Sequence, residues 1–418
     1  MSYSRDELIY LLTEAAELEH MLCCNYLFAA FSTKRSGEHF SDPEQASKVI
    51  SWTQSISFVA RQEMEHLAMV CNLLSAIGGP PHLRRPNFPQ PKRFSLAALS
   101  LEPLCISALD RFIAFEKPDE QYQPETVLKS FKKRQDISPG PVEYHSLGDL
   151  YAKILAGIMA FPGGDAALFI GPPQAQMDGA QLNLDFPRLG LLGGVYGITL
   201  FPVTDTASAK RAIEMIVEQG EGGGDIEDEA SHYYRFKQIK KEMQADPNFN
   251  PAHPVVSNPI LKPLPGETPG TVVTHEPSRA VMDLFNAAYE VTLLLLMRLF
   301  AYTDETEEEA EALRYAAFFP MMTMVIRPLG EILVTMPAFG EDRPERAGPS
   351  FETYHSTDFI PHKAAAWVVL QERFDAMAKD AAELGKEGVH ERLPYIAESL
   401  KLIGEKFANM IAAGNTQS

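Results

Sequence analysis

The 418-residue chain carries 37 basic and 56 acidic side chains, giving a formal net charge of −19, and 45% of its residues are hydrophobic. The acidic balance argues against nucleic acid or an anionic membrane surface as a partner, while the hydrophobic content suffices for a globular core. No apolar run reaches the roughly 18 residues of a membrane span, and the first residues lack a signal-peptide pattern. The four cysteines have no disulfide or CxxC spacing. We therefore expect a reduced, soluble, cytoplasmic protein.

The first predicted helix runs from Ser4 to about Phe31. Ser4 and Glu7, three residues apart, form a capping-box pattern, and apolar residues recur at helical spacing along the segment. Glu19 lies on this apolar stripe, and Tyr26 follows it seven residues later. A carboxylate that faces a core needs a partner, because the burial of an unpaired charge is costly.

A second predicted helix ends at residues 78–81, where the sequence Gly-Gly-Pro-Pro stops it. Glu63 and His66 lie three residues apart on the apolar face of this helix. In an antiparallel hairpin of the two helices, Glu63 would meet Glu19 at a similar height. A metal ion is one partner that satisfies a buried carboxylate and a buried imidazole together.

Residues 82–203 predict a large insertion between two helical hairpins, and its proline-rich and basic first part is expected to wrap the surface. Three helices are predicted within the insertion, at residues 104–115, 125–133 and 144–161. The glycine-rich remainder predicts irregular structure with room for one short strand at residues 195–201.

After the insertion the pattern predicts two more helices joined by a glycine-rich turn, at residues 207–220 and 226–244. The second of them contains another Glu-x-x-His pair, Glu229 and His232, which would share one face. Glu218 and Glu221 precede the turn. The apolar face of their helix excludes Glu218 and only borders Glu221, so both stay open as ligands.

Residues 246–277 contain eight prolines, which exclude a helix or a central strand and predict a linker. Residues 278–418 predict a second helical region. We therefore expect a mainly α protein in three parts: a metal-binding bundle at residues 1–245, the linker, and a C-terminal helical region.

Two Glu-x-x-His helices, with one Glu from each of two further helices, form the ligand layout of di-iron and di-manganese bundles. This layout makes seven residues candidate metal ligands: Glu19, Glu63, His66, Glu218, Glu221, Glu229 and His232. His20 and Tyr26 are expected to orient ligands, although a direct ligand role for His20 stays open.

Several motifs resemble those of a known family. Glu19 with Tyr26, and Glu63 with His66, resemble the first hairpin of ferritins and rubrerythrins. A closer resemblance, to the ferritin-like domain family related to iminophenylpyruvate dimer synthase, rests on residues 17–20, 63–66, 72–79, 219–222, 231–233 and 347–352. The resemblance implies a ferritin-like four-helix bundle with a carboxylate-bridged centre of two metal ions.

Carboxylate and imidazole ligands suit iron first, with manganese or zinc as alternatives. We expect an oxidoreductase that acts on a small organic substrate or on dioxygen or peroxide, and the resemblance adds the oxidative coupling of an amino-acid-derived imine. The alternative is a non-catalytic metal-binding or scaffold protein whose bundle is structural. No nucleic-acid or membrane partner is expected, and a homo-oligomer is left open.

Overall fold

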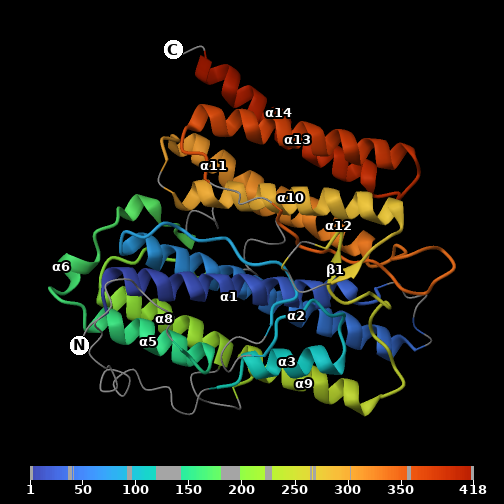
Figure 1. The fold of residues 1–418 in the computed structure, drawn as a ribbon, viewed down its shortest axis with the longest axis horizontal. Helices are drawn as coiled ribbons and strands as arrows, with labels where there is room; N and C mark the ends of the chain where they lie inside the picture. The colour runs from blue at the N-terminus through green and yellow to red at the C-terminus, as the bar shows by residue number, and fades with distance from the viewer. Residues whose placement is uncertain are drawn as a thin grey trace. The chain divides into compact units, whose positions relative to one another are not determined.

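The chain forms two compact units (Figure 1). The first consists of Met1–Pro86, Gln90–Ser100 and Leu104–Ala252, and the second of Asn87–Pro89, Leu101–Pro103 and His253–Ser418. The computed structural model describes residues 3–35, 40, 42–91, 97–118, 143–179, 198–221, 228–263, 266, 270–301, 303–354 and 359–415.

Helix α1 (Arg5–Ser32) begins where the sequence predicts it. The Ser4 side chain accepts a hydrogen bond from the Glu7 N–H, and the Glu7 side chain accepts one from the Ser4 N–H, so the predicted capping box is present. Buried residues occur in every turn of α1 and on all its sides, as expected of a helix that is surrounded by others. Its polar residues at mid-length, Glu19 among them, are therefore held inside the unit.

Helix α2 (Pro43–Ala76) packs along α1 in the antiparallel direction. The Thr53 hydroxyl, in the first half of α2, donates a hydrogen bond of 2.8 Å to the Thr33 Oγ1 atom at the end of α1. At the other end of the pair, Arg5 donates to the Ile77 carbonyl oxygen. These contacts fix the register that brings the middle of α1 beside the middle of α2.

Helices α1 and α2 form one half of the bundle, and shorter helices form the other half, as Figure 1 shows. Helix α5 (Leu147–Met159) packs against α1 and α8 (Thr206–Glu221), while α3 (Ile106–Phe115) packs against α9 (His232–Ala245). Helices α3 and α5 both belong to the predicted insertion. The insertion therefore supplies part of the bundle, through the helices predicted at residues 104–115 and 144–161.

Helix α9 starts later than the sequence pattern predicts. Local hydrogen bonds hold the preceding residues in a turn: the Asp228 side chain accepts from the Ala230 N–H, and the Asp228 carbonyl oxygen accepts from the Ser231 hydroxyl. Ser231 is then the N-cap of α9. Glu229 lies in this turn, so the prediction that Glu229 and His232 share a helical face is wrong.

Within its described residues the rest of the insertion is irregular, as predicted, apart from two short turns of helix, α6 (Asp165–Leu168) and η2 (Pro173–Ala175). The Asn72 side chain anchors it to α2, because Asn72 Nδ2 donates to the carbonyl oxygens of Met177 and Phe201, and Oδ1 accepts from the Met177 N–H. The predicted helix at residues 125–133 and residues 195–197 of the predicted strand lie outside the described residues, and residues 198–201 form no strand.

The second unit is mainly helical, as predicted. One parallel pair of two-residue strands, β1 (Pro259–Ile260) and β2 (Thr271–Val272), lies in the predicted linker region. The helices that follow are α10 (Glu276–Phe300), α11 (Glu307–Ala316), the π-helix η4 (Ala317–Ile326), α12 (Arg327–Leu333), α13 (Lys363–Lys386) and α14 (Leu393–Asn415). The pair α13 and α14 is closely packed.

Two helical stretches of the second unit, Glu276–Phe300 and Glu307–Leu333, have the length and hydropathy that a membrane-spanning helix requires. Of the apolar window in the first stretch, 72% is buried within the protein, as in the core helix of a globular protein.

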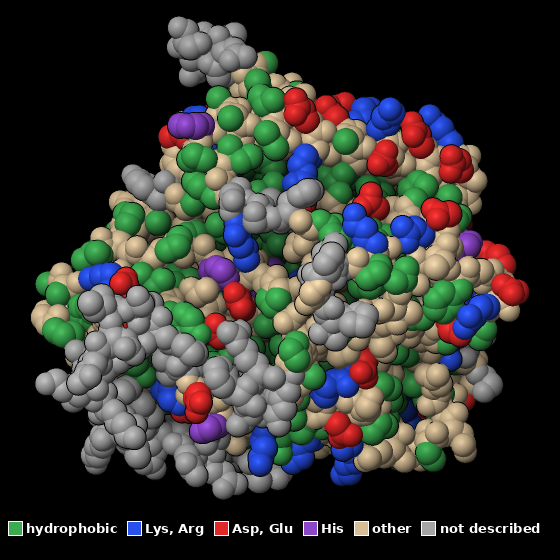
Figure 2. All heavy atoms as spheres, in the orientation of Figure 1, with side chains coloured by type: hydrophobic (Ala, Val, Ile, Leu, Met, Phe, Trp, Pro, Cys, Tyr) green, Lys and Arg blue, Asp and Glu red, His purple; other side chains and the backbone are tan. Residues whose placement is uncertain are grey.

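Acidic and basic side chains lie interspersed on the face of the molecule that Figure 2 shows. Oppositely charged residues also pair at i,i+4 spacing along helices, such as Glu44 with Lys48 and Glu405 with Lys401. The acidic run at residues 304–311 contains the first turn of α11, which Thr306 caps. As predicted, these negative charges lie at the helix N-terminus, where they interact favourably with the helix dipole.

Candidate metal centre

Glu63 lies at the middle of a buried polar cluster between α1, α2 and α9. Its Oε2 atom lies 3.2 Å from His66 Nδ1, and its Oε1 atom lies 2.8 Å from His232 Nδ1. The two imidazole rings are stacked with their centroids 5.6 Å apart. One carboxylate therefore faces two histidines that come from different helices, with one oxygen directed to each.

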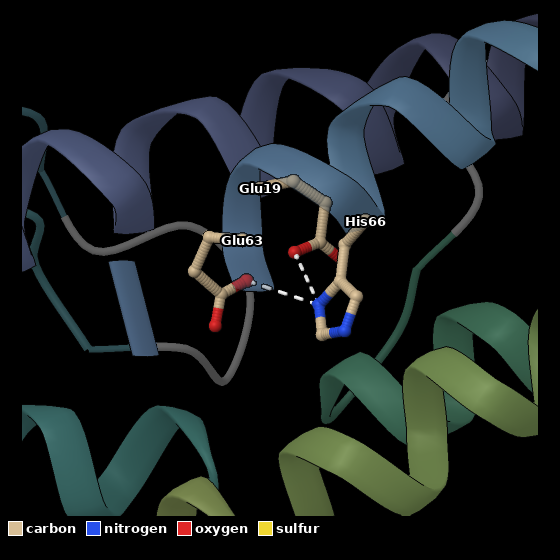
Figure 3. A group of neighbouring side chains, drawn as sticks. All are labelled: Glu19, Glu63 and His66. Atoms are coloured by element: carbon tan, nitrogen blue, oxygen red, sulfur yellow. Dashed lines mark hydrogen bonds and ion pairs between the residues drawn. The ribbon is translucent and has the colours of Figure 1, made fainter. Parts of the chain in front are cut away.

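Two further carboxylates complete the cluster. Glu19 Oε2 lies 3.6 Å from His66 Nδ1 (Figure 3), and Glu116 Oε2 lies 3.5 Å from His232 Nδ1. The ligand atoms of Glu19, Glu63 and His66 all lie within 4.8 Å of one another, as do those of Glu63, Glu116 and His232. We call these the Glu19 group and the Glu116 group. Both groups contain Glu63, so this carboxylate could contribute a ligand atom to either one.

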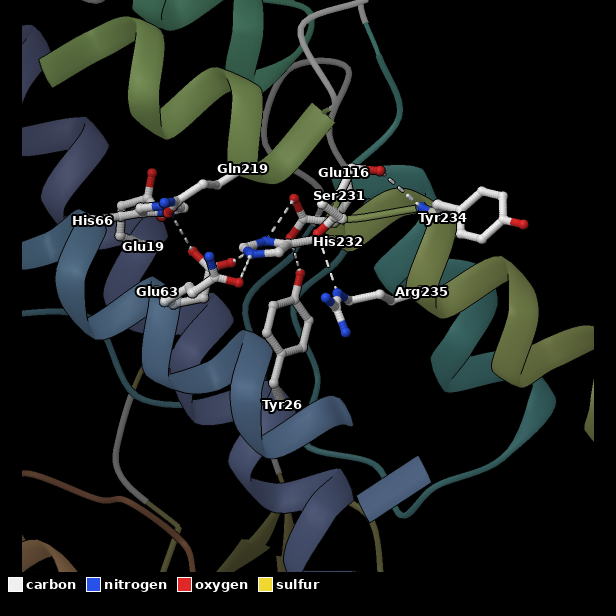
Figure 4. A network of polar contacts seen from close by, with 12 residues as sticks. Glu19, Tyr26, Glu63, His66, Glu116, Gln219, Ser231, His232, Tyr234 and Arg235 are labelled. Atoms are coloured by element: carbon white, nitrogen blue, oxygen red, sulfur yellow. Dashed lines mark hydrogen bonds and ion pairs between the residues drawn. The ribbon is translucent and has the colours of Figure 1, made fainter. Parts of the chain in front are cut away.

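A buried tyrosine holds the outer carboxylate of each group, and Figure 4 shows the contact of Tyr26 with Glu116. The Tyr26 hydroxyl donates a hydrogen bond to Glu116 Oε1, and the Tyr151 hydroxyl donates one of 2.5 Å to Glu19 Oε1. In each carboxylate the other oxygen, Oε2, faces the histidine. The tyrosines therefore fix which oxygen each outer glutamate offers to the cluster.

A glutamine holds the far nitrogen of each histidine. His66 Nε2 lies 2.9 Å from Gln219 Oε1, and His232 Nε2 lies 3.2 Å from Gln62 Oε1. An amide oxygen only accepts hydrogen bonds, so each Nε2 carries a proton and donates it to the glutamine. This arrangement directs both Nδ1 atoms to the carboxylates, as in metal-binding histidines whose second nitrogen is held by an acceptor.

Burial and mutual charge shift the pKa values throughout the cluster. Burial, followed by the neighbouring Glu63 charge, raises the pKa of Glu19 to about 8. Burial alone would lower the pKa of His232, but the charges of Glu63 and Glu116 raise it to about 9. Burial opposes ionisation of Glu63 as well, yet the two imidazoles hold the pKa of this carboxyl below its usual range. The cluster thus favours bound positive charge, which either protons or metal ions can supply.

The Glu116 group passes a direct test of fit to a metal ion. Glu63 Oε1 and His232 Nδ1 are buried and lie 2.8 Å apart as an ion pair, but neither atom makes a hydrogen bond of good geometry within the described part of the chain. Buried polar atoms without a partner are rare in folded proteins. A cation between them would satisfy both, and their oxygen and imidazole donors are those that iron, manganese and zinc accept.

The structure brings together four of the seven ligands predicted from the sequence: Glu19, Glu63, His66 and His232. Glu218 and Glu229 are exposed and lie outside both groups. Glu218 is on the solvent side of α8, as its apolar pattern indicates, and Glu229 is held in the turn before α9. Glu221 ends α8, and its side chain lies outside the described residues.

The two residues predicted to orient ligands have different surroundings. Tyr26 contacts the cluster through Glu116. His20 is buried but belongs to neither group. Burial lowers the pKa of His20, as does the nearby Arg85 charge, and the imidazole has a hydrogen bond with the Leu83 backbone. His20 therefore faces the segment that follows α2.

Sequence reasoning missed Glu116, which follows the last residue of α3 and is 2% exposed. A signal for it was present, because Glu116 continues the buried stripe of Leu109 and Phe112 at helical spacing. Helix α8 makes room for this carboxylate with a glycine: a Cβ atom added at Gly220 would lie only 3.1 Å from Glu116 Oε2. Contact between segments this far apart in sequence could not be read from either segment alone.

These features define a helical bundle with a carboxylate–histidine cluster at its centre. A family model described as Ferritin-like matches residues 12–241, which is more than half of the chain, and the chain belongs to this family. The family predicted from the sequence motifs is thus confirmed, together with the helical bundle and the C-terminal helices.

Two characterised relatives are similar along almost the whole chain. The dichlorochromopyrrolate synthase of Lentzea aerocolonigenes is 30% identical over 96% of this chain and 42% of its own length. The 2-imino-3-(indol-3-yl)propanoate dimerase of Chromobacterium violaceum is 27% identical over 91% of this chain and 37% of its own length. The chain therefore spans less than half the length of these relatives.

Among solved structures, a ferritin-like protein from Caulobacter vibrioides is similar at 18% sequence identity and a TM-score of 0.48. The similarity covers 75% of this chain and 96% of that one.

Proposed function

We propose that this protein is a two-metal oxidoreductase that couples two molecules of an aromatic 2-imino acid. The observation that carries the proposal is the Glu63 carboxylate, which directs one oxygen to each of two buried imidazoles. The substrate class comes from the relative in Chromobacterium violaceum, a dimerase of 2-imino-3-(indol-3-yl)propanoate. Iron is the first choice of metal, with manganese or zinc as alternatives.

Each group of the cluster would hold one ion. Glu19 and His66 would bind the first, Glu116 and His232 the second, and Glu63 would bind both. When bound, iron ions supply the capacity to accept and transfer electrons between the organic substrate and dioxygen or peroxide. The protein side chains keep the donor atoms in position: Tyr26 and Tyr151 hold the outer carboxylates, and Gln62 and Gln219 hold the imidazoles.

The proposed reaction requires an oxidant. Coupling two imino acids forms one carbon–carbon bond and breaks one carbon–hydrogen bond in each molecule, which releases two electrons and two protons. Hydrogen peroxide accepts these and becomes two molecules of water. With dioxygen as the oxidant, the same electrons and protons yield one molecule of hydrogen peroxide.

The test uses the purified chain, which is first loaded with ferrous iron in the absence of oxygen. The imino acid is formed in place from L-tryptophan by an added L-amino-acid oxidase, which also produces peroxide. We expect mass spectrometry to detect a product with twice the mass of the imino acid less two hydrogen atoms. Zinc-loaded protein is the control, because zinc binds to the same donors and has no redox chemistry.

The Glu63→Gln variant separates this proposal from its alternative. We expect the variant to form the coupled product no faster than the reaction without the chain. If wild type and Glu63→Gln give product at the same rate, or if iron-loaded wild type gives none, catalysis by the cluster is contradicted. A chain that binds metal under those conditions would then be the non-catalytic metal-binding or scaffold protein.

A further inference from the structure

Two arginines lie against one phenylalanine ring near the carboxylate–histidine cluster. The guanidinium carbon of Arg61 on α2 lies 5.1 Å from the centroid of the Phe58 ring, and that of Arg235 on α9 lies 4.8 Å from it. Cation–π contacts of this kind are attractive, but two like charges at one ring repel each other. An anion beside Arg235 would reduce that repulsion.

Among the residues that the structure describes, one of these two guanidinium groups is paired with a carboxylate. Arg61 forms an ion pair of 2.5 Å with Glu65. Arg235 donates from Nε to the Ala230 carbonyl oxygen at 3.1 Å, and among the described residues no carboxylate lies within ion-pair distance of it. Its terminal nitrogens thus form a partly exposed donor fork, in a chain whose net charge is −19. Such a fork matches the two oxygens of a carboxylate.

Phe58 and Arg235 lie close in sequence to residues of the cluster and its surroundings. Phe58 lies one helical turn before Gln62 on α2, and Arg235 lies three residues after His232 on α9. The hydrogen bond between Gln62 and His232 therefore joins the same two helix faces that carry the ring and the guanidinium. Figure 4 shows Arg235 extending from α9 toward α2 on the side of Tyr26 and His232. Along α9, Arg235 and His232 of the Glu116 group are separated by about one helical turn, roughly 5 Å.

We propose that Arg235, supported by Arg61 and the Phe58 ring, binds the carboxylate of the 2-imino acid. This inference rests on the proposed function for the class of substrate. The guanidinium of Arg235 pairs with the carboxylate, and the Phe58 ring holds this guanidinium in place. The imine end then extends along the α2–α9 contact toward the Glu116 group.

The experiment measures binding by isothermal titration calorimetry to the full chain. The probe is 3-(indol-3-yl)-2-oxopropanoate, in which a stable ketone replaces the imine, and its methyl ester is the neutral reference. We expect wild type to bind the acid at least about tenfold more tightly than the ester, since hydrogen bonds between charged groups are the strong ones. In Arg235→Met this preference should fall to less than about twofold, and Arg235→Lys should retain part of it.

Arg211→Met is the matched control. Arg211 also stacks on an aromatic ring, with its guanidinium carbon 4.2 Å from the Phe201 centroid, but it lies on α8 away from the cluster. We expect this variant to keep the full preference for the acid. Because acid and ester are compared within one protein, a general loss of folding affects both and does not imitate the expected result.

The outcomes separate this inference from the proposed function. Equal affinity of wild type for acid and ester, no binding of either, or an unchanged preference in Arg235→Met, would overturn the carboxylate site. Coupled product in the assay described above would leave the function standing in each case. An acid preference that depends on Arg235, with no coupled product, would support the site and contradict the reaction.

Discussion

Glu19 and Glu116 occupy equivalent places on the two sides of Glu63. Each directs its Oε2 atom at a histidine Nδ1, at 3.6 Å and 3.5 Å respectively, and each accepts a hydrogen bond from a buried tyrosine at Oε1. The first comes from the middle of α1 and the second from the end of α3. Because the two halves are built alike, we expect them to bind two ions of the same kind.

Substitution of the shared carboxylate should affect both ions. In Glu63→Gln one oxygen and the negative charge are lost, so we expect the metal content to fall from about two ions per chain to well below one. Inductively coupled plasma mass spectrometry after gel filtration measures this content. Wild-type content in Glu63→Gln would show that the cluster is not the metal centre.

Substitution of Glu116 should affect one ion only. In Glu116→Gln we expect about one ion per chain to remain, held by the Glu19 group, because the remaining donors still include two carboxylates and an imidazole. Glu218→Gln is the matched control, since Glu218 is exposed on α8, and it should keep the wild-type content. The opposite pattern, loss in Glu218→Gln alone, would return the ligand role to Glu218.

Removal of a glutamine that holds a histidine should weaken metal binding without abolishing it. In Gln219→Leu, His66 loses the acceptor that fixes its proton on Nε2, and we expect metal affinity about 10- to 100-fold lower. Gln219→Glu should retain or increase the affinity, because a carboxylate is a stronger acceptor. Competition with a chelator of known affinity measures the change.

The control for this experiment is Gln54→Leu, which alters an exposed glutamine on the same helix as His66. We expect it to bind metal as wild type does. If Gln219→Leu and Gln54→Leu both retain full affinity, the hydrogen bond to Gln219 does not position His66.

Loss of a tyrosine hydroxyl should destabilise the metal-free protein. Tyr26 is 0% exposed, and Tyr26→Phe leaves Glu116 Oε1 buried without its donor. We expect the free energy of unfolding of the first unit to fall by about 1–3 kcal/mol. Urea unfolding followed by circular dichroism in the presence of a chelator measures this change.

Tyr395→Phe provides the comparison, because Tyr395 is 76% exposed and its hydroxyl is accessible to water. The expected change is within about 0.5 kcal/mol. Equal stability of Tyr26→Phe and Tyr395→Phe would mean that the Tyr26 hydroxyl contributes nothing to the buried cluster.

The sequence by itself determined the helical class, the capping of α1 and the residues of the Glu19 group. Periodic apolar residues place Glu19, Glu63 and His66 on buried helix faces, because a helix has a fixed period and its core face can be read from it. The hairpin of α1 and α2 then needs only a short connection. For this reason the Glu19 group was accessible to sequence reasoning.

Only the tertiary structure decided the far side of the cluster. Helix α3 lies in the insertion, yet it packs against α9 and brings Glu116 to His232. Glu229, which the spacing favoured, is removed by side-chain hydrogen bonds that end the helical pattern before His232. The position of Glu116 depends on a contact between distant segments, and that of Glu229 depends on local competition for backbone hydrogen bonds. The spacing of apolar residues carries no information about either.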